Sequence, residues 1–259
     1  MIIIGAVTIT AFGIDAADTL KGEGGTMLAQ LAGKKVSPCP VGMQSIDAAM
    51  TFTCADTYEV SAGNGCPHQR PQSTLDTVRN IQVTDCHGVS QEGSEPWRFV
   101  TRDQALQLCA REGKRLPTAA EWYTLALASA GEAACNTNTS AVSPTGAFAA
   151  CATPQGVYDL IGNVWEWVSD DVRDGTHNGA TLPSSGYVAQ VDSAGIATAI
   201  DAAPVELFNK DYFWARADGV YGMIRGGFYG SGDDAGLYSV HADALPSNAS
   251  PGIGFRCVS

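Results

Sequence analysis

The side chains of this sequence that could support redox or metal chemistry are eight cysteines and four histidines. No two cysteines have the C-x-x-C spacing of a zinc ribbon, so zinc binding is not predicted. The histidines also lack the spacing of a ligand cluster: His68, His87, His177 and His241. No G-x-S-x-G elbow, phosphate-binding loop or H-E-x-x-H string occurs. None of these common catalytic centres is therefore predicted.

The even number of cysteines is consistent with disulfide bonds. Cys66 and Cys86 flank an irregular stretch with several Gly and Pro residues, and we predict a bridge between them. Cys135 and Cys151 lie near the two ends of a polar, small-residue stretch at 131–156, which we interpret as an inserted loop closed by a second bridge. Disulfides suggest an extracellular setting, but intracellular proteins of hyperthermophiles also contain them, so the cysteine count leaves the compartment open.

The charge of the chain limits its partners. The formal net charge is −12 and the isoelectric point is about 4.6, so phosphate backbones and anionic membranes are repelled unless a local basic patch exists. The only adjacent basic pairs are at 34–35 and 114–115. Nucleic-acid binding is therefore not predicted. The first fourteen residues are apolar, but a membrane helix needs about 20 such residues, so no membrane insertion is predicted either.

The length of 259 residues is consistent with one main domain. Residues 2–10 are rich in β-branched types, which predicts an N-terminal strand, and glycines follow at 22–25. We therefore expect an N-terminal strand or arm at 1–35 and a domain at 36–259. A processed targeting segment or a docking arm is the alternative interpretation of the first residues.

Two helices are predicted from a repeated capping pattern, S/T-x-x-E/Q. Thr101 with Gln104 precedes a helix at about 102–112. Thr118 with Glu121 begins a second helix, whose buried face contains a tryptophan.

Strands are predicted at 52–61, within 157–170 and in two pieces near the C-terminus. In the second of these, Trp165 and Trp167 lie on one face. Residues 171–222 show no clear period, and we interpret them as a long surface excursion.

Four strings in a fixed order are similar to the formylglycine-generating-enzyme, or sulfatase-modifying-factor, family. They are DTYEVS (56–61), CAREGKRLPTAAEW (109–122), GVYDLIGNVWEWVSD (156–170), and the pair RGGFY (225–229) with GIGFRCV (252–258). The resemblance implies an α+β fold of the C-type-lectin type, with two helices, short twisted strands and long loops. Arg115 and Glu121 would anchor the turn between the helices, and Gly226 with Gly227 would permit close backbone approach.

The resemblance also implies two structural features. In the enzymes, a cysteine matching Cys109 is bridged to the one matching Cys257. The enzymes bind Ca²⁺ around the third string, which implies four ligands here: Asp159, Glu166 and the carbonyl groups of Gly162 and Val164. Asp159 stands where an asparagine is expected. The alternative is that Glu166 pairs with Arg115 or caps a turn.

The resemblance does not extend to the catalytic residues. The enzymes hold copper through two cysteines between the RGG and GFR strings, whereas residues 228–253 contain no cysteine, so no copper site is expected. The related iron-dependent sulfoxide synthases need a histidine cluster, which the spacing of the histidines does not predict. Catalysis is therefore not expected.

The same interval lacks Gln, Glu, Lys, Met and Trp, all of which occur elsewhere in the chain. A codon that is randomised at its first two bases and ends in C cannot encode these five. Together with its place in the sequence, this pattern resembles the variable proteins of diversity-generating retroelements, which implies a variable region at 225–256. We predict twelve ligand-contacting residues: Phe228, Tyr229, Ser231, Asp233, Asp234, Leu237, Tyr238, Ser239, His241, Asp243, Leu245 and Asn248.

The leading hypothesis is thus a hypervariable receptor-like protein that binds a protein or a glycan. An ordinary loop of a degenerate family member would also account for the segment. Two hypotheses from other classes are a formylglycine-generating-like oxidoreductase or modifying enzyme with a relocated site, and a structural surface or virion protein. A cell-surface, secreted or virion location is favoured.

Overall fold

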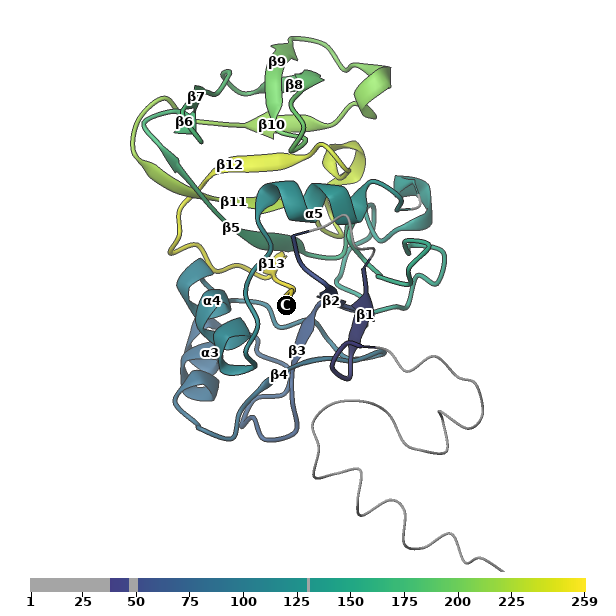
Figure 1. Cartoon of the computed structure of the whole chain (residues 1–259), viewed down its shortest axis with the longest axis vertical. Coiled ribbons are helices and arrows are strands. Elements are labelled where there is room, and N and C mark those ends of the chain that lie inside the picture. Colours follow the sequence, from purple (N-terminus) through teal and green to yellow (C-terminus); the bar gives the residue numbers. More distant parts are fainter. Residues whose placement is uncertain (1–37, 47–50, 130) are drawn as a thin grey trace, which may run out of the picture. The chain divides into compact units, whose positions relative to one another are not determined.

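The computed structural model describes residues 38–46, 51–129 and 131–259 (Figure 1). The N-terminal strand or arm expected at 1–35 lies outside the described residues. Val41–Ser259 form one compact unit, which contains the whole candidate site. No helix in the described part of the chain is long and apolar enough to span a bilayer.

The largest element of this unit is a nine-stranded sheet with the order β7-β6-β5-β11-β12-β10-β8-β9, in which β13 also pairs with β5. Most neighbours are antiparallel, but β10 pairs with β12 and β13 with β5 in parallel. Figure 1 shows β12 lying between β11 and β10. The strands are β5 (Trp165–Arg173), β6 (Thr176–His177), β7 (Ala180–Thr181), β8 (Gly186–Val191), β9 (Ala197–Asp201), β10 (Tyr212–Trp214), β11 (Val220–Arg225), β12 (Val240–Ala244) and β13 (Ile253–Gly254).

Two small antiparallel sheets lie before the large one in the sequence. One pairs β1 (Met43–Ser45) with β2 (Cys54–Asp56), and the other pairs β3 (Val60–Ala62) with β4 (Gly88–Ser90). The single strand predicted at 52–61 is therefore divided into β2 and β3. The division lies beside Glu59, whose buried carboxylate binds the loop before β5 rather than a strand neighbour.

Three helices occur in the described ranges: α3 (Thr74–Ile81), α4 (Arg102–Arg111) and α5 (Ala119–Ala126). The two predicted helices match α4 and α5, and both have complete capping boxes. The prediction of only two helices is wrong because α3 was missed. The apolar residues Leu75 and Val78 of α3 are exposed and only Thr77 and Asn80 are buried, so the helix lacks the buried apolar face by which a helix is usually recognised. Short 3₁₀ turns occur at η2 (Glu132–Ala134), η3 (Glu206–Phe208) and η4 (Gly232–Asp234).

The interpretation of residues 171–222 as an irregular excursion is also wrong. This stretch contains β6 to β10 and adds the pair β8–β9 to one side of the large sheet. The register between β8 and β9 shifts twice, near Gln190. Such irregularities break the alternation of side chains by which a strand is recognised in a sequence.

Disulfides fix the connections that surround the sheet. They join Cys66 to Cys86, Cys109 to Cys257, and Cys135 to Cys151, which are the three pairs expected from the sequence and the resemblance. The bridge to Cys257 attaches the C-terminal segment to α4. Arg115 and Glu121, which were expected to anchor the turn between the helices, form an ion pair at the start of α5, with an Nη1 to Oε2 distance of 2.6 Å.

Candidate ligand-binding site

A pocket of about 640 Å³ opens beside β12, between the end of β11 and the segment before β13. Its volume lies in the range of small-molecule and side-chain sites. Five of the twelve predicted ligand-contacting residues line it: Phe228, His241, Asp243, Leu245 and Asn248. These residues come from both ends of the cysteine-free segment, which β11 and β12 bring together.

The inner wall of the pocket is apolar. Trp165 of β5, Ile224 of β11 and Ile253 of β13 line it, and each is no more than 6% exposed. Strand pairing places them together, since Ile253 lies opposite Trp165 and Ile224 lies opposite His241. Burial of a ligand's apolar group against this wall would be favourable.

The ring of His241 is held in an aromatic cluster. It stacks on Trp214 of β10 with ring centroids 4.0 Å apart and an interplanar angle of 10°. Trp165 meets the same ring at its edge, with centroids 5.0 Å apart. The parallel pairing of β10 with β12 puts Trp214 opposite His241 and so produces the stack.

Asp243 carries the negative charge of the pocket. Its carboxylate lies 3.0 Å from Nδ1 of His241 and 3.7 Å from Nε of Arg216. Burial opposes ionisation, but the hydrogen bond and charge of His241 and the charge of Arg216 hold the pKa of Asp243 below its usual value. Arg216 also lines the pocket, and 63% of its side chain is exposed.

The predicted residues between 229 and 234 lie away from the pocket lining. Tyr229 packs edge-on against Phe228, with centroids 4.9 Å apart. The hydroxyl of Ser231 accepts a hydrogen bond from the backbone of Phe228. Asp233 is exposed and lines a separate recess of about 340 Å³. Asp234 is half-buried, and burial together with the charge of Asp233 raises its pKa.

The next three predicted residues point inward. Leu237 and Tyr238 pack against the core, and Tyr238 contacts the ring of Phe208 with centroids 5.1 Å apart. Ser239 is fully buried, and its hydroxyl donates to the carbonyl of Asp234. The twelve residues predicted to contact a ligand therefore do not share one exposed face, and Ser239 is a structural residue.

Two buried groups hold this inward-facing part of the segment. Arg225 at the end of β11 donates to the carbonyl of Leu237 at 3.1 Å and to those of Ala119 and Gly195 at 3.1 Å each. Burial lowers the pKa of Arg225 to about 10. The carboxylate of Asp211 accepts from the backbone of Tyr238 at 2.6 Å. The segment is thus anchored to the scaffold between its two displayed ends.

A buried ion pair connects the C-terminal string with β5. Arg256 and Glu166 are both fully buried, with an Nη2 to Oε1 distance of 2.6 Å. The indole of Trp122 donates to the other oxygen of Glu166 at 2.7 Å. Glu166 therefore pairs with Arg256 and not with Arg115, the partner considered in the sequence.

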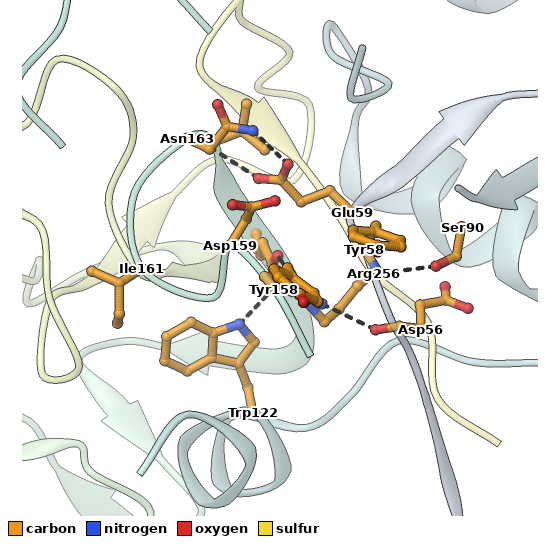
Figure 2. A network of polar contacts seen from close by, with 12 residues as sticks. Asp56, Tyr58, Glu59, Ser90, Trp122, Tyr158, Asp159, Ile161, Asn163 and Arg256 are labelled. Atoms are coloured by element: carbon orange, nitrogen blue, oxygen red, sulfur yellow. Dashed lines mark hydrogen bonds and ion pairs between the residues drawn. The ribbon is translucent and has the colours of Figure 1, made fainter. Parts of the chain in front are cut away.

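Two further buried carboxyl groups lie near this pair, and Figure 2 shows them facing each other. Glu59 accepts from the side chain of Asn163 at 2.6 Å and from the backbone of Val164 at 3.2 Å. Burial, with the charges of Asp159 and Glu166, raises the pKa of Glu59 well above its usual value. Burial also raises the pKa of Asp159 to about 6.

Residues 48–259 match the family model of the sulfatase-modifying factor enzyme 1-like domain. The chain belongs to this family. The match covers most of the sequence, and it confirms the family suggested by the four strings. The fold is accordingly of the α+β, C-type-lectin-like type of formylglycine-generating enzymes, as expected.

Individual members and solved structures are more distant. Hercynine oxygenase from Mycolicibacterium smegmatis (strain ATCC 700084 / mc(2)155) is 26% identical over 152 residues, which cover 52% of this chain and 30% of the oxygenase. The Major Tropism Determinant I1 variant is 18% identical, with a TM-score of 0.44 over 86% of this chain and 57% of that chain. PvdO from Pseudomonas aeruginosa is 18% identical, with a TM-score of 0.45 over 83% of this chain and 89% of that chain. The chain thus spans only part of the first two proteins.

The calcium ligands implied by the family do not fit the described structure as a set: Asp159, Glu166 and the carbonyls of Gly162 and Val164. Both carboxylate oxygens of Glu166 already accept hydrogen bonds, from Arg256 and Trp122. One oxygen of Asp159 accepts from the backbone of Gly146 at 2.6 Å. Calcium binding at these four residues is thus implied by the resemblance alone, and the hydrogen bonds of Glu166 and Asp159 do not support it.

The histidines of this family member lie at separate positions, each beside its own carboxylate: His68 by Asp76, His87 by Glu112, His177 by Asp170, and His241 by Asp243. In the described ranges, no three His, Cys, Asp or Glu side chains form a group that could hold a metal ion.

Several pocket residues were not predicted from the sequence as ligand contacts. Trp165 was assigned only to a strand. Arg216 and Tyr221 line the pocket, and Trp214 supports His241, but all three lie in the stretch interpreted as irregular. The one sequence signal was the aromatic string YFW at 212–214, which is typical of a strand.

Proposed function

We propose that this protein is a ligand-binding member of its family, which recognises its partner through the pocket beside β12. The observation that carries the proposal is the convergence of Phe228, His241, Asp243, Leu245 and Asn248 on one cavity. Aromatic, apolar and polar side chains around a preformed pocket are typical of recognition surfaces.

The lack of cysteine between the RGG and GFR strings supports binding rather than copper chemistry at this position. The compositional pattern of the segment supports a hypervariable role, in which related copies differ at the displayed positions while the scaffold stays constant. The disulfides favour an oxidising environment, consistent with a cell-surface, secreted or virion protein.

The proposal is tested by panning a phage-displayed library of random 12-residue peptides, and in parallel an oligosaccharide array, on the immobilised full chain. Binders are then measured on a pocket variant, His241→Ala with Leu245→Ser and Asn248→Ser. We expect affinity to fall at least about tenfold, because central contact residues contribute most of the binding free energy.

The matched control changes the exposed face of α3, with Leu75→Ser, Val78→Ser and Arg79→Ser. Each variant removes one half-exposed leucine, Leu75 (53% exposed) in the control and Leu245 (49% exposed) in the pocket variant, and the control also removes Val78, so it loses at least as many exposed apolar residues as the pocket variant. The control should keep full affinity, and circular dichroism should show both variants folded. Binders that are indifferent to the pocket variant contradict the proposal. Metal-dependent turnover of a cysteine-containing peptide would favour the modifying-enzyme alternative instead.

A further inference from the structure

The charged groups of the pocket differ in how many of their hydrogen-bonding atoms already have a partner. Asp243 already interacts through both carboxylate oxygens, with His241 and with Nε of Arg216. The Nη atoms of Arg216 donate to no group among the described residues, although the side chain lines the pocket. The guanidinium of Arg216 is therefore the charged group of the pocket whose hydrogen-bond donors are still available to a ligand. Its planar fork matches the two oxygens of a carboxylate.

Two of the aromatic rings of the pocket, those of His241 and Phe228, are partly covered. Trp214 covers one face of His241, and Trp165 lies edge-on to that ring. The Phe228 ring lies against Gly252, where a Cβ would meet it at 2.7 Å. Sugars pack on free faces of aromatic rings. The buried side chains of Ile224 and Ile253 instead form an apolar wall that suits an amino-acid side chain of a ligand. The apolar wall of Trp165, Ile224 and Ile253, together with the guanidinium of Arg216, is suited to an apolar and an acidic protein side chain and so favours a protein ligand over a glycan.

We propose that the pocket binds a protein loop carrying a carboxylate next to a large apolar side chain. The apolar side chain contacts Trp165, Ile224 and Ile253, and the carboxylate binds the fork of Arg216. This inference rests on the proposed function and names its ligand class. The net charge of −12 repels acidic partners at a distance, but screening over about 8 Å at physiological salt leaves the short-range contact with Arg216 to determine selectivity.

The test uses three probes of similar shape and different charge, titrated into the full chain: indole-3-propionate, indole-3-propionamide and 3-(indol-3-yl)propan-1-amine. Binding is followed by amide chemical shifts. We expect the carboxylate to bind about fivefold more tightly than the amide and the amine to bind most weakly, a modest preference because Arg216 is largely exposed. The shifts should cluster at residues 241–253.

Arg216→Gln should remove the preference for the carboxylate and leave the affinity for the amide unchanged. The matched control is Arg173→Gln, because Arg173 is 65% exposed and likewise lies beside an aspartate, Asp171. It should bind all three probes as the natural chain does.

Equal or tighter binding of the amide or the amine overturns the inference, as does a preference that survives Arg216→Gln. If no probe binds while library peptides still require the pocket, the ligand class is wrong but the proposed function stands. If only oligosaccharides need the pocket, the choice of a protein partner is wrong. If no binder of any kind needs it, the proposed function itself fails.

Discussion

Carboxylates in this protein differ in what stabilises them. Glu166 is fully buried, and its partner Arg256 is fully buried as well, so both depend on each other and on neighbouring dipoles. Glu121 instead binds Arg115, 45% of whose side chain is exposed. It also accepts hydrogen bonds from Thr51 and from the backbone of Thr118. The two carboxylates therefore differ in the exposure of the cation that stabilises them.

Glu121 should make unfolding depend on pH in the acid range. Burial alone would raise its pKa, but the hydrogen bonds from Arg115, Thr51 and Thr118 outweigh burial and lower the pKa to about 2. A lowered pKa stabilises the fold above about pH 4.5, and this contribution is lost as the pH falls from 4.5 toward 2. After a discount for the exposure of Arg115, we expect a contribution of about 2 kcal/mol at pH 7.

Urea unfolding at pH 2.5 to 7 of the natural chain and of Glu121→Gln measures this contribution. The difference in unfolding free energy should be largest above pH 5 and shrink toward pH 2.5. A difference that is constant over this range would show that the carboxylate charge does not matter.

Individual pairs were predictable where they are local. Arg115 and Glu121 are six residues apart, and the capping pattern already placed Glu121 at the start of a helix. The partner of Glu166 is 90 residues away in the sequence, and only the packing of the C-terminal string on β5 decides between Arg256 and Arg115. The family motifs in the sequence could not show which of the two arginines pairs with Glu166.

The turn that follows β11 determines where the cysteine-free segment at 228–253, called the pocket segment below, begins. Gly226 and Gly227 both have positive φ, at 94° and 87°. A Cβ on Gly226 would lie 2.4 Å from the carbonyl oxygen of Leu160, and one on Gly227 would lie 2.4 Å from the Cβ of Ala235. The close backbone approach expected from the sequence is therefore present, and it brings Ala235, at the end of η4, against the turn.

Gly227→Ala should destabilise the protein by about 3 kcal/mol or more, because it combines an unfavourable φ with a clash against Ala235. Gly232→Ala is the control. Gly232 also has a positive φ, of 58°, but its Cβ would meet nothing within 4 Å, so only about 1 kcal/mol is expected. Thermal and urea unfolding compare the two. Equal losses would mean that the contact with Ala235 contributes nothing.

Helices with a complete capping box were found in the sequence, whereas α3, which has the Ser73 cap but an aspartate in place of Glu or Gln, and strands defined by their neighbours were not. The helices α4 and α5 begin at paired polar residues that are visible in the sequence. Strand β10 has only three residues, and its neighbours are β8 and β12, which lie on either side of it in the sequence. Its role in supporting His241 through Trp214 therefore could not be predicted.

The whole unit is closed by its last residues. Val258 forms bridges to Ala55 and Arg115, and the carbonyl of Ser259 accepts from the backbone of Thr53. The pocket segment lies between β11 and this C-terminal string, so both of its ends are fixed in the core. Family strings identified both ends, whereas the shape of the pocket depended on contacts from the stretch 171–222.

The bridge between Cys109 and Cys257 should contribute more stability than the bridge between Cys135 and Cys151. They close loops with sequence separations of 148 and 16 residues. Chain entropy then gives about 5 kcal/mol for the first and about 3 kcal/mol for the second. Replacing each pair with alanine and measuring urea unfolding should show this difference of about 2 kcal/mol.

All four cysteines are buried, so the loss of packing on replacement by alanine is similar in the two variants and largely cancels in the comparison. Equal losses would mean that the bridges stabilise the fold through local packing alone. A larger loss for the Cys109 to Cys257 pair is the result that chain entropy predicts. Whether the bridge also holds residues 228–253 in place is measured separately: if it does, partner binding weakens in the same variant under conditions where it remains folded.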